Sequence, residues 1–283
     1  MAVKRIWFLS DLHIGSYYGL MGDEWISGEG NNYSPNKGQK YLIDCWRHML
    51  RSVSKCDYLI FNGDVIDGRG HPRKTSFDSI TTNVAEQSEN AIEILTPLRK
   101  RVREMYFIRG TPVHDQESGE PVEYIAKSVG AKKLENGAYS TYSLFKHVGG
   151  HTFQISHKIG TSQVPFYRAT QFGRELMLAG LLGRKEPELN ADIIVRGHNH
   201  YYMHLETTTQ HAIALPCFQL QTPYMTSIAP FAFIPRIGAV VVELNDSDES
   251  CPVKVMRYLY GHPRVSFVVE NEEVEKKIAK KDR

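Results

Sequence analysis

The chain has 283 residues, 41% of them hydrophobic and 23% charged, which suits one large packed α/β domain and is unlike the composition of a disordered protein. Its formal net charge of +2 is too small to indicate nucleic-acid binding, although it does not exclude a local basic groove. The four cysteines form no Cys-x-x-Cys pair, so the sequence argues against a thiolate zinc site and favours reduced thiols in the cytoplasm. It contains neither a signal-peptide pattern nor an apolar run of membrane-spanning length, so we expect no membrane association.

The first half of the sequence alternates short apolar runs with helical patterns. The apolar runs predict buried strands at residues 6–9, 58–61 and 105–108. Apolar residues at helical spacing predict helices over residues 42–53 and 78–102, and Pro97 should kink the second helix or begin a separate final turn. Between the first strand and the first helix, residues 15–40 are rich in Gly, Asn and Tyr, which predicts a long functional loop.

The second half of the sequence is richer in strands. We expect these over residues 139–148, 151–156, 192–195, 202–215, 238–244 and 253–260. Gly149-Gly150 predicts a tight turn, and residues 166–182 predict a helix. The sequence thus predicts a mixed α/β domain over residues 1–270, with helices covering one sheet or two packed sheets, and a charged C-terminal tail at 271–283.

Acidic and histidine side chains follow the apolar strand-like runs. They are Asp11, His13, Asp64, His157, His198 and His200. Because ligand sites gather beyond the carboxyl ends of strands in α/β sheets, we expect these side chains to converge on one edge. Buried together, the carboxylates would repel each other, whereas divalent metals bind ionised carboxylate and neutral imidazole at once. Mixed nitrogen and oxygen ligands favour Mn, Fe or Zn over Mg or Ca.

The spacing of these residues supports a shared site. Asp-x-His and His-x-His have one residue between their members, so on an extended segment each pair faces the same way. Gly63 and Gly197 precede Asp64 and His198, where glycine would let the backbone approach closely. A lone Asp-x-His is most often part of a loop or a helix cap, and a lone Gly-Asp is usually a turn. It is the ordered conjunction of motifs that predicts a metal centre.

Together the motifs resemble the calcineurin-like metallophosphoesterase superfamily, in a variant similar to phage and DNA-repair nucleases. The family pattern is Asp-x-His, Gly-Asp-x-x-Asp, Gly-Asn-His-Asp/Glu, a single His, and Gly-His-x-His. Here the matching blocks are Asp11-Leu12-His13, Gly63-Asp64-Val65-Ile66-Asp67, Gly110-Thr111-Pro112-Val113-His114-Asp115, Ser156-His157-Lys158 and Gly197-His198-Asn199-His200. Four of these five blocks are intact. The match spans residues 10 to 200, most of the chain.

The resemblance implies a fold and a set of ligand roles. The fold would be a four-layer α/β/β/α sandwich of two packed mixed β-sheets, with a dinuclear metal site at the carboxyl-terminal edge of the strands. Asp11, His13 and His200 would bind the first metal. Asp64 would bridge both metals. His157 and His198 would bind the second, while Asp67 would lie behind the ligands.

The third block departs from the family pattern, because Thr111 follows Gly110 where the family has an asparagine ligand. Two interpretations stay open. Thr111 could take the ligand position while His114, oriented by Asp67, acts as general acid. Alternatively, His114 or a water completes the coordination of the second metal. In both cases the candidate catalytic residues are His114 and Asp67.

Other residues are less specific. Arg69, Arg109 and Arg196 lie beside motif residues and could bind phosphate, or they could be ordinary surface charges. Aromatic residues in the segments 15–40 and 216–235 could stack on bases or form a dimer interface, or could simply pack. Six further histidines have no motif context and are taken as structural or surface residues: His48, His71, His147, His151, His204 and His211.

The leading hypothesis is therefore a phosphodiesterase that hydrolyses nucleic acid or nucleotides with two divalent metal ions, manganese being preferred and iron or zinc being alternatives. A phosphomonoesterase or small-nucleotide phosphatase with the same metals is the first alternative. A non-catalytic binding scaffold, as in the family's retromer subunit, is the second. We expect a cytoplasmic protein whose partners are a phosphate-ester substrate, which could be DNA or a nucleotide, and in a homodimer a second copy.

Overall fold

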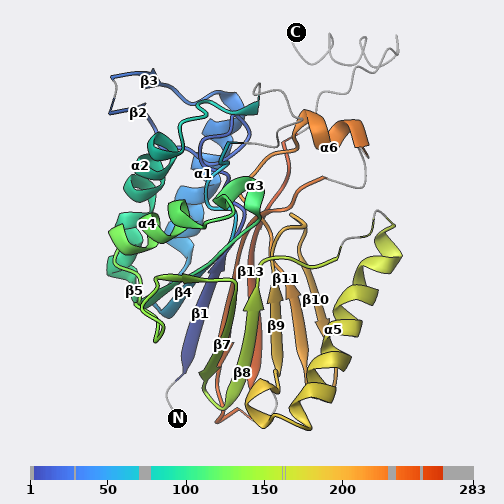
Figure 1. Cartoon of the computed structure of the whole chain (residues 1–283). Helices are drawn as coiled ribbons and strands as arrows, with labels where there is room; N and C mark the ends of the chain where they lie inside the picture. The colour runs from blue at the N-terminus through green and yellow to red at the C-terminus, as the bar shows by residue number, and fades with distance from the viewer. Residues whose placement is uncertain are drawn as a thin grey trace, which may run out of the picture.

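Two β-sheets lie face to face, and helices cover the outer face of each (Figure 1). The computed structural model of the chain describes residues 3–28, 30–69, 78–160, 162, 164–228, 234–248 and 251–263. The predicted tail at 271–283 lies outside these residues. In the described part of the chain, none of the helices combines the length and the apolar character that crossing a membrane requires.

The first sheet has the strand order β13-β12-β1-β4-β5-β6. Its strands are β1 (Lys4–Leu9), β4 (Cys56–Asn62), β5 (Val102–Ile108), β6 (Ser140–Thr141), β12 (Ile237–Leu244) and β13 (Val253–Tyr260). β1, β4, β5 and β6 run parallel, β12 pairs antiparallel with β1, and β13 pairs antiparallel with β12. The parallel strands therefore bring their carboxyl ends to one edge.

The second sheet has the order β10-β11-β9-β8-β7. Its strands are β7 (Ser143–Val148), β8 (His151–Ser156), β9 (Ile193–Arg196), β10 (Met203–Glu206) and β11 (His211–Ala214). β8, β9 and β11 are parallel, and antiparallel β7 and β10 flank them. Gly149 and Gly150, both with positive φ, turn the chain between β7 and β8 as predicted.

Hydrophobic side chains fill the spaces between the layers. Trp7 and Leu9 of β1 pack toward helices α1 (Lys37–Ser52), α2 (Val84–Leu95) and α4 (Glu120–Ser128). Their neighbours Ile6 and Phe8 point the other way, into the core between the sheets, where Phe8 meets Phe153 of β8 at 6.1 Å between ring centroids. This alternation buries both faces of β1, as expected for a strand inside a layered α/β fold.

Helix α5 (Arg168–Gly183) covers the outer face of the second sheet (Figure 1). Its Phe172 and Leu176 pack on Ile194 of β9 and Ala212 of β11. The order of layers is therefore helix, sheet, sheet, helix, which confirms the predicted four-layer α/β/β/α sandwich.

The predicted elements are found with changes at their boundaries, except that the strand expected at 139–148 is divided into β6 of the first sheet and β7 of the second. The helix expected from residue 78 begins at Val84, because the Asn83 side chain caps it by accepting from the Ala85 amide. It ends at Leu95, and Pro97 lies in a separate 3₁₀ helix, Thr96–Arg101. The expected strand at 202–215 is the two strands β10 and β11 joined by a turn.

Several short elements were not predicted. They are β2 (Trp25–Ile26), β3 (Asn32–Tyr33), α3 (Pro112–Asp115), α4, α6 (Pro223–Ile228) and the 3₁₀ turns Pro165–Tyr167 and Pro187–Leu189. The predicted loop at 15–40 contains β2 and β3, and α1 begins within it after an Asn36–Gln39 capping box. Trp25 is buried and stacks on Tyr33 at 4.7 Å, so these two loop aromatics pack on each other, whereas Tyr17 is exposed.

Candidate metal centre

The candidate ligands meet where both sheets end at the same edge. Asp11 follows β1 and Asp64 follows β4, two parallel neighbours in the first sheet. His157 follows β8, and His198 and His200 follow β9, again parallel neighbours but in the second sheet. The cluster therefore takes its carboxylates from one sheet and most of its imidazoles from the other.

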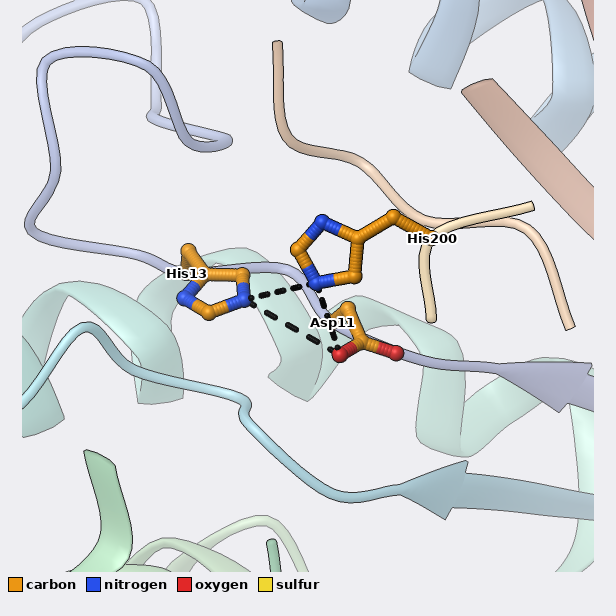
Figure 2. Close-up of side chains that lie close together, drawn as sticks. All are labelled: Asp11, His13 and His200. Carbon is orange, nitrogen blue, oxygen red and sulfur yellow. Dashed lines mark hydrogen bonds and ion pairs between the residues drawn. The ribbon is translucent and has the colours of Figure 1, made fainter. Parts of the chain in front are cut away.

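The first group of side chains is Asp11, His13 and His200, whose potential ligand atoms all lie within 4.8 Å of one another. Figure 2 shows the two imidazoles and the carboxylate pointing toward one another. Asp11 Oδ1 is 3.0 Å from His200 Nε2 and 3.9 Å from His13 Nε2. The two Nε2 atoms are 3.3 Å apart. All three side chains are buried, so this is a compact set of nitrogen and oxygen donors.

The second group is Asp64, His157 and His198, again with ligand atoms within 4.8 Å. Asp64 Oδ2 is 3.0 Å from His157 Nε2. His157 Nδ1 donates a hydrogen bond to the backbone oxygen of Asn62 at 2.6 Å. This leaves Nε2 as the potential metal-ligand atom that faces the cluster.

A third group, His13, Asp64 and His114, connects the other two. His114 Nε2 is 4.0 Å from Asp64 Oδ2, and its ring meets that of His13 edge-on at 4.5 Å. His114 Nδ1 donates to the backbone oxygen of Asp67 at 2.6 Å. The Asp67 carboxylate lies 3.5 Å from His13 Nδ1 and accepts a hydrogen bond from Ser79 at 2.7 Å. His114 and Asp67 therefore border the cluster directly.

Thr111 points its donors at Asp64. Its backbone amide lies 2.7 Å and its hydroxyl 3.2 Å from Asp64 Oδ1. Gly110, just before it, donates its amide to the Asp115 carboxylate. Thr111 thus holds one oxygen of Asp64 in place and leaves the other, Oδ2, toward His157 and His114.

Two of the three candidate arginines lie away from the cluster. Arg196 is buried on the outer face of β9, where it pairs with Glu175 of α5 at 2.5 Å. Arg109 donates to Ser140 at 2.9 Å and lies 3.8 Å from Glu123 of α4, so it joins α4 to the sheet. Arg69 is exposed, directly before the residues that are not described.

Backbone strain marks the same cluster, a signal that residue types alone could not give. Among the described non-glycine residues, six have positive φ, and Gln116 is the one outside the ligand set. The others are Asp11 (53°), His13 (45°), Asp64 (49°), His198 (67°) and His200 (54°). The left-handed region costs a non-glycine residue roughly 1–2 kcal/mol, and such residues persist where a functional arrangement requires them.

The glycines before Asp64 and His198 allow the close approach that the sequence predicted. A Cβ on Gly197 would collide with the Ser10 hydroxyl, and one on Gly63 would collide with the His157 ring. Gly63 also has a φ of 81°, which favours glycine. These two positions let the ends of the two sheets come into contact.

The ionisable side chains of the cluster strongly shift one another's pKa values. Burial raises the pKa of Asp64, but the neighbouring His157 and His114 outweigh it and hold this pKa well below its usual range. Burial lowers the pKa of His157, but Asp64 and Asp11 raise it to about 10 overall. Burial, with His157 nearby, lowers the pKa of His198 to about 4. Divalent metals bind ionised carboxylate and neutral imidazole, so a metal ion at His157 would replace the proton that Asp64 and Asp11 stabilise there.

The nitrogen and oxygen atoms of the cluster are better suited to binding metal ions than to forming hydrogen bonds with one another. Within the described residues, His157 Nε2 faces the cluster and is buried without a hydrogen bond, although Asp64 lies 3.0 Å from it. Buried polar atoms without partners are rare and point to a missing ligand or ion. Two carboxylates and five imidazoles, arranged in linked groups of three, suit divalent transition metals.

Several solved structures are similar to the chain at low sequence identity. Among curated proteins, no sequence matches the chain. One similar solved structure is Entamoeba histolytica Vps29 complexed with Zn²⁺, with 14% identity and a TM-score of 0.41, covering 91% of this chain and 99% of that one. Another is a predicted phosphoesterase from Streptococcus pneumoniae, with 13% identity, a TM-score of 0.37 and coverage of 91% and 99%. A third, a novel archaeal phosphodiesterase, has 10% identity, a TM-score of 0.39 and coverage of 89% and 99%.

The sequence model of one family matches residues 4–202, which is most of the chain and includes every candidate ligand from Asp11 to His200. That family is described as calcineurin-like phosphoesterase. Its match agrees with the four-layer fold and with the site at the strand ends. The chain belongs to the calcineurin-like phosphoesterase family.

Proposed function

We propose that the chain is a dinuclear-metal-dependent phosphodiesterase that acts on nucleic acid or nucleotides. This proposal rests on two groups of three potential metal ligands, which a third group, His13, Asp64 and His114, connects. Linked groups of this kind suit two ions held near each other, and the buried Nε2 of His157, which has no hydrogen bond, supports the same assignment.

Each side chain then has a role. Asp11, His13 and His200 would hold the first ion, His157 and His198 would hold the second, and Asp64 would serve both. When bound, two divalent ions stabilise negative charge on the attacking and leaving oxygens and lower the pKa of a water nucleophile. Manganese is the preferred metal in this proposal, with iron or zinc as alternatives.

We assign His114 to proton transfer and Thr111 to positioning Asp64. His114 Nδ1 is already committed to the Asp67 backbone oxygen, so Nε2 is the atom that can hand a proton to the leaving alcohol. Burial lowers the pKa of His114, but Asp64 and Asp67 raise it overall, which favours the protonated form that a general acid needs. The Thr111 hydroxyl faces Asp64 and is therefore less suited to be a ligand itself.

The positions of the arginines favour a diester over a monoester substrate. A phosphate monoester carries one more negative charge than a diester near neutral pH and benefits from cationic side chains around it. Arg109 and Arg196 are held by Glu123 and Glu175 away from the cluster.

The free thiols of the four cysteines support the accompanying proposal that the protein works in the reducing cytoplasm.

The test compares hydrolysis of bis-p-nitrophenyl phosphate and p-nitrophenyl phosphate with added Mn²⁺. The proteins are the wild type, Asp64→Asn, and Asp44→Asn as a control, because Asp44 is an exposed aspartate of α1. We expect metal-dependent diester cleavage that Asp64→Asn abolishes and Asp44→Asn leaves intact. Cleavage of the monoester alone would indicate a phosphatase. Bound metal without cleavage of either ester would contradict the proposal and favour the scaffold alternative, and absence of bound metal would overturn it entirely.

A further inference from the structure

A second group of potential metal ligands lies on the hairpin formed by β10 and β11. His204 and Glu206 come from β10, His211 comes from β11, and their potential ligand atoms all lie within 4.8 Å of one another. Motif analysis gave His204 and His211 no role, because they belong to none of the five family blocks. The register of the hairpin is what brings them together.

Strand pairing places all three side chains on one face of the sheet. Glu206 is paired directly with His211, and His204 is paired with Ile213. Paired residues in antiparallel strands share a face, and so do residues two apart on one strand. Ile213 points into the core between the two sheets, so the three ligands lie on that inner face, where the core gives way to solvent beside the edge strand β10.

This group is separate from the metal centre described above. His211 is paired with Ile193, the first residue of β9, whereas His198 and His200 follow the last residue of the same strand. The two clusters therefore lie at opposite ends of the second sheet. Neither the family motifs nor the proposed phosphoesterase activity uses His204, Glu206 or His211.

Two nitrogen atoms of His204 and His211 are nearly as far apart as two nitrogens bound to one metal ion. His204 Nε2 and His211 Nδ1 are 3.0 Å apart, and the rings stack at 5.3 Å with 16° between their planes. Two nitrogens on one tetrahedral zinc ion lie about 3.3 Å apart, given bonds of roughly 2.0–2.1 Å. Burial lowers the pKa of both histidines, and neutral imidazole is the form that binds metal. Glu206 is exposed, so its side chain can turn to bring a carboxylate oxygen within range.

We propose that His204, Glu206 and His211 form a second metal site that binds one divalent transition-metal ion of the zinc class. Two imidazoles and a carboxylate are a borderline donor set that prefers Zn²⁺, Ni²⁺ or Cu²⁺ to Mg²⁺ or Ca²⁺. The bound ion links β10 to β11 across the turn at residues 207–210 and stabilises the edge of the second sheet. In the absence of a metal ion, the two histidines can form a hydrogen bond with each other.

The experiment counts zinc ions per chain by plasma mass spectrometry after dialysis of the full-length protein at micromolar Zn²⁺. We compare the wild type with the double variant His204→Gln/His211→Gln. The control is His48→Gln/His147→Gln, which removes two exposed histidines outside every candidate metal group. We expect the control to bind as many ions as the wild type and the double variant to bind one fewer, with hydrolysis of bis-p-nitrophenyl phosphate unchanged.

A second variant keeps the test decisive if the double variant folds poorly. Glu206→Gln changes one exposed side chain, and we expect at least a tenfold loss of zinc affinity at this site. Equal zinc counts and affinities in the wild type and in these variants would overturn the proposal. The outcome is independent of the phosphoesterase proposal, because Asp64→Asn should lose ions at the main centre while retaining the ion at His204, Glu206 and His211.

Discussion

Nδ1 of His157 donates to the backbone oxygen of Asn62 across 2.6 Å, and this contact joins the last residue of β4 to the residue that follows β8 in the other sheet. The hydrogen bond fixes the orientation and tautomer of the ring, so that Nε2 faces Asp64. The same device recurs at His114, whose Nδ1 donates to the Asp67 oxygen at 2.6 Å. In both cases the backbone decides which nitrogen faces the cluster.

Replacing His114 by glutamine should separate proton donation from metal binding. We expect kcat to fall by roughly 10²–10⁴ for a diester whose leaving group is an alkyl alcohol, because that oxygen needs a proton. A p-nitrophenyl ester should lose much less, because p-nitrophenolate leaves without one. Kinetics on a dinucleotide and on a nucleotide p-nitrophenyl ester provide the comparison. An equal loss on both substrates, accompanied by one missing ion, would instead make His114 a ligand.

Strain at the site can be measured by exchanging His198 for glycine and for alanine. Both variants remove the imidazole, so the difference between their free energies of unfolding measures the cost of a side chain at φ 67°. We expect the glycine variant to be more stable than the alanine variant by about 1 kcal/mol, the reverse of the usual order in regular structure. Urea unfolding of the chelator-treated proteins gives the comparison. If alanine proved as stable as glycine, His198 would not be strained.

The pair formed by buried Arg196 and half-buried Glu175 should contribute to stability and not to substrate binding. Glu175→Gln leaves the Arg196 charge without its partner and should reduce the free energy of unfolding by about 3 kcal/mol. The double variant Arg196→Met/Glu175→Leu should recover most of that loss, because no buried charge is left unpaired. Both variants should keep the kcat/KM of the wild type. A fall in kcat/KM without a change in stability would place Arg196 in the substrate site.

Asp64 and His157 should give the chelator-treated protein a characteristic pH profile. The folded-state pKa of Asp64 is lowered, so its contribution to stability is present above the unfolded value of about 3.9 and is lost as pH falls below it. The folded-state pKa of His157 is raised to about 10, so its contribution is complete below about pH 6.5 and is lost as pH rises toward 10. The stability difference between the wild type and Asp64→Asn should therefore be largest between about pH 4 and 6.5. A flat difference across the pH range would contradict the coupling.

Much of the fold was predictable, because buried strands such as β1 and β4 are short apolar runs with polar residues directly after them. Helix α4 was missed, since its nine residues are too few to show a clear helical period between the motif residues and β6. The start of α2 was placed too early, because its boundary depends on the Asn83 cap and not on hydrophobic spacing.

At the site, the order of motifs identified the residues that the fold brings together. The arginines that could have bound phosphate were harder to predict. Arg196 follows an apolar run just as the ligands do, yet strand alternation turns it to the outer face, toward Glu175. The His204–His211 pair had no local signal, because the pairing of β10 with β11 creates it. The left-handed backbone of the ligands was equally invisible in residue types.

The division of the metal centre between two sheets has a consequence for its evolution and its engineering. Asp11 and Asp64 move with one sheet, and His157, His198 and His200 move with the other, so the sandwich interior sets the spacing of the donors. A change at Phe153, which packs against Phe8 in the core between the sheets, would shift one half of the donor set against the other. We therefore expect metal affinity to depend on how the two sheets are aligned, so that core residues outside the ligand set become positions for tuning it.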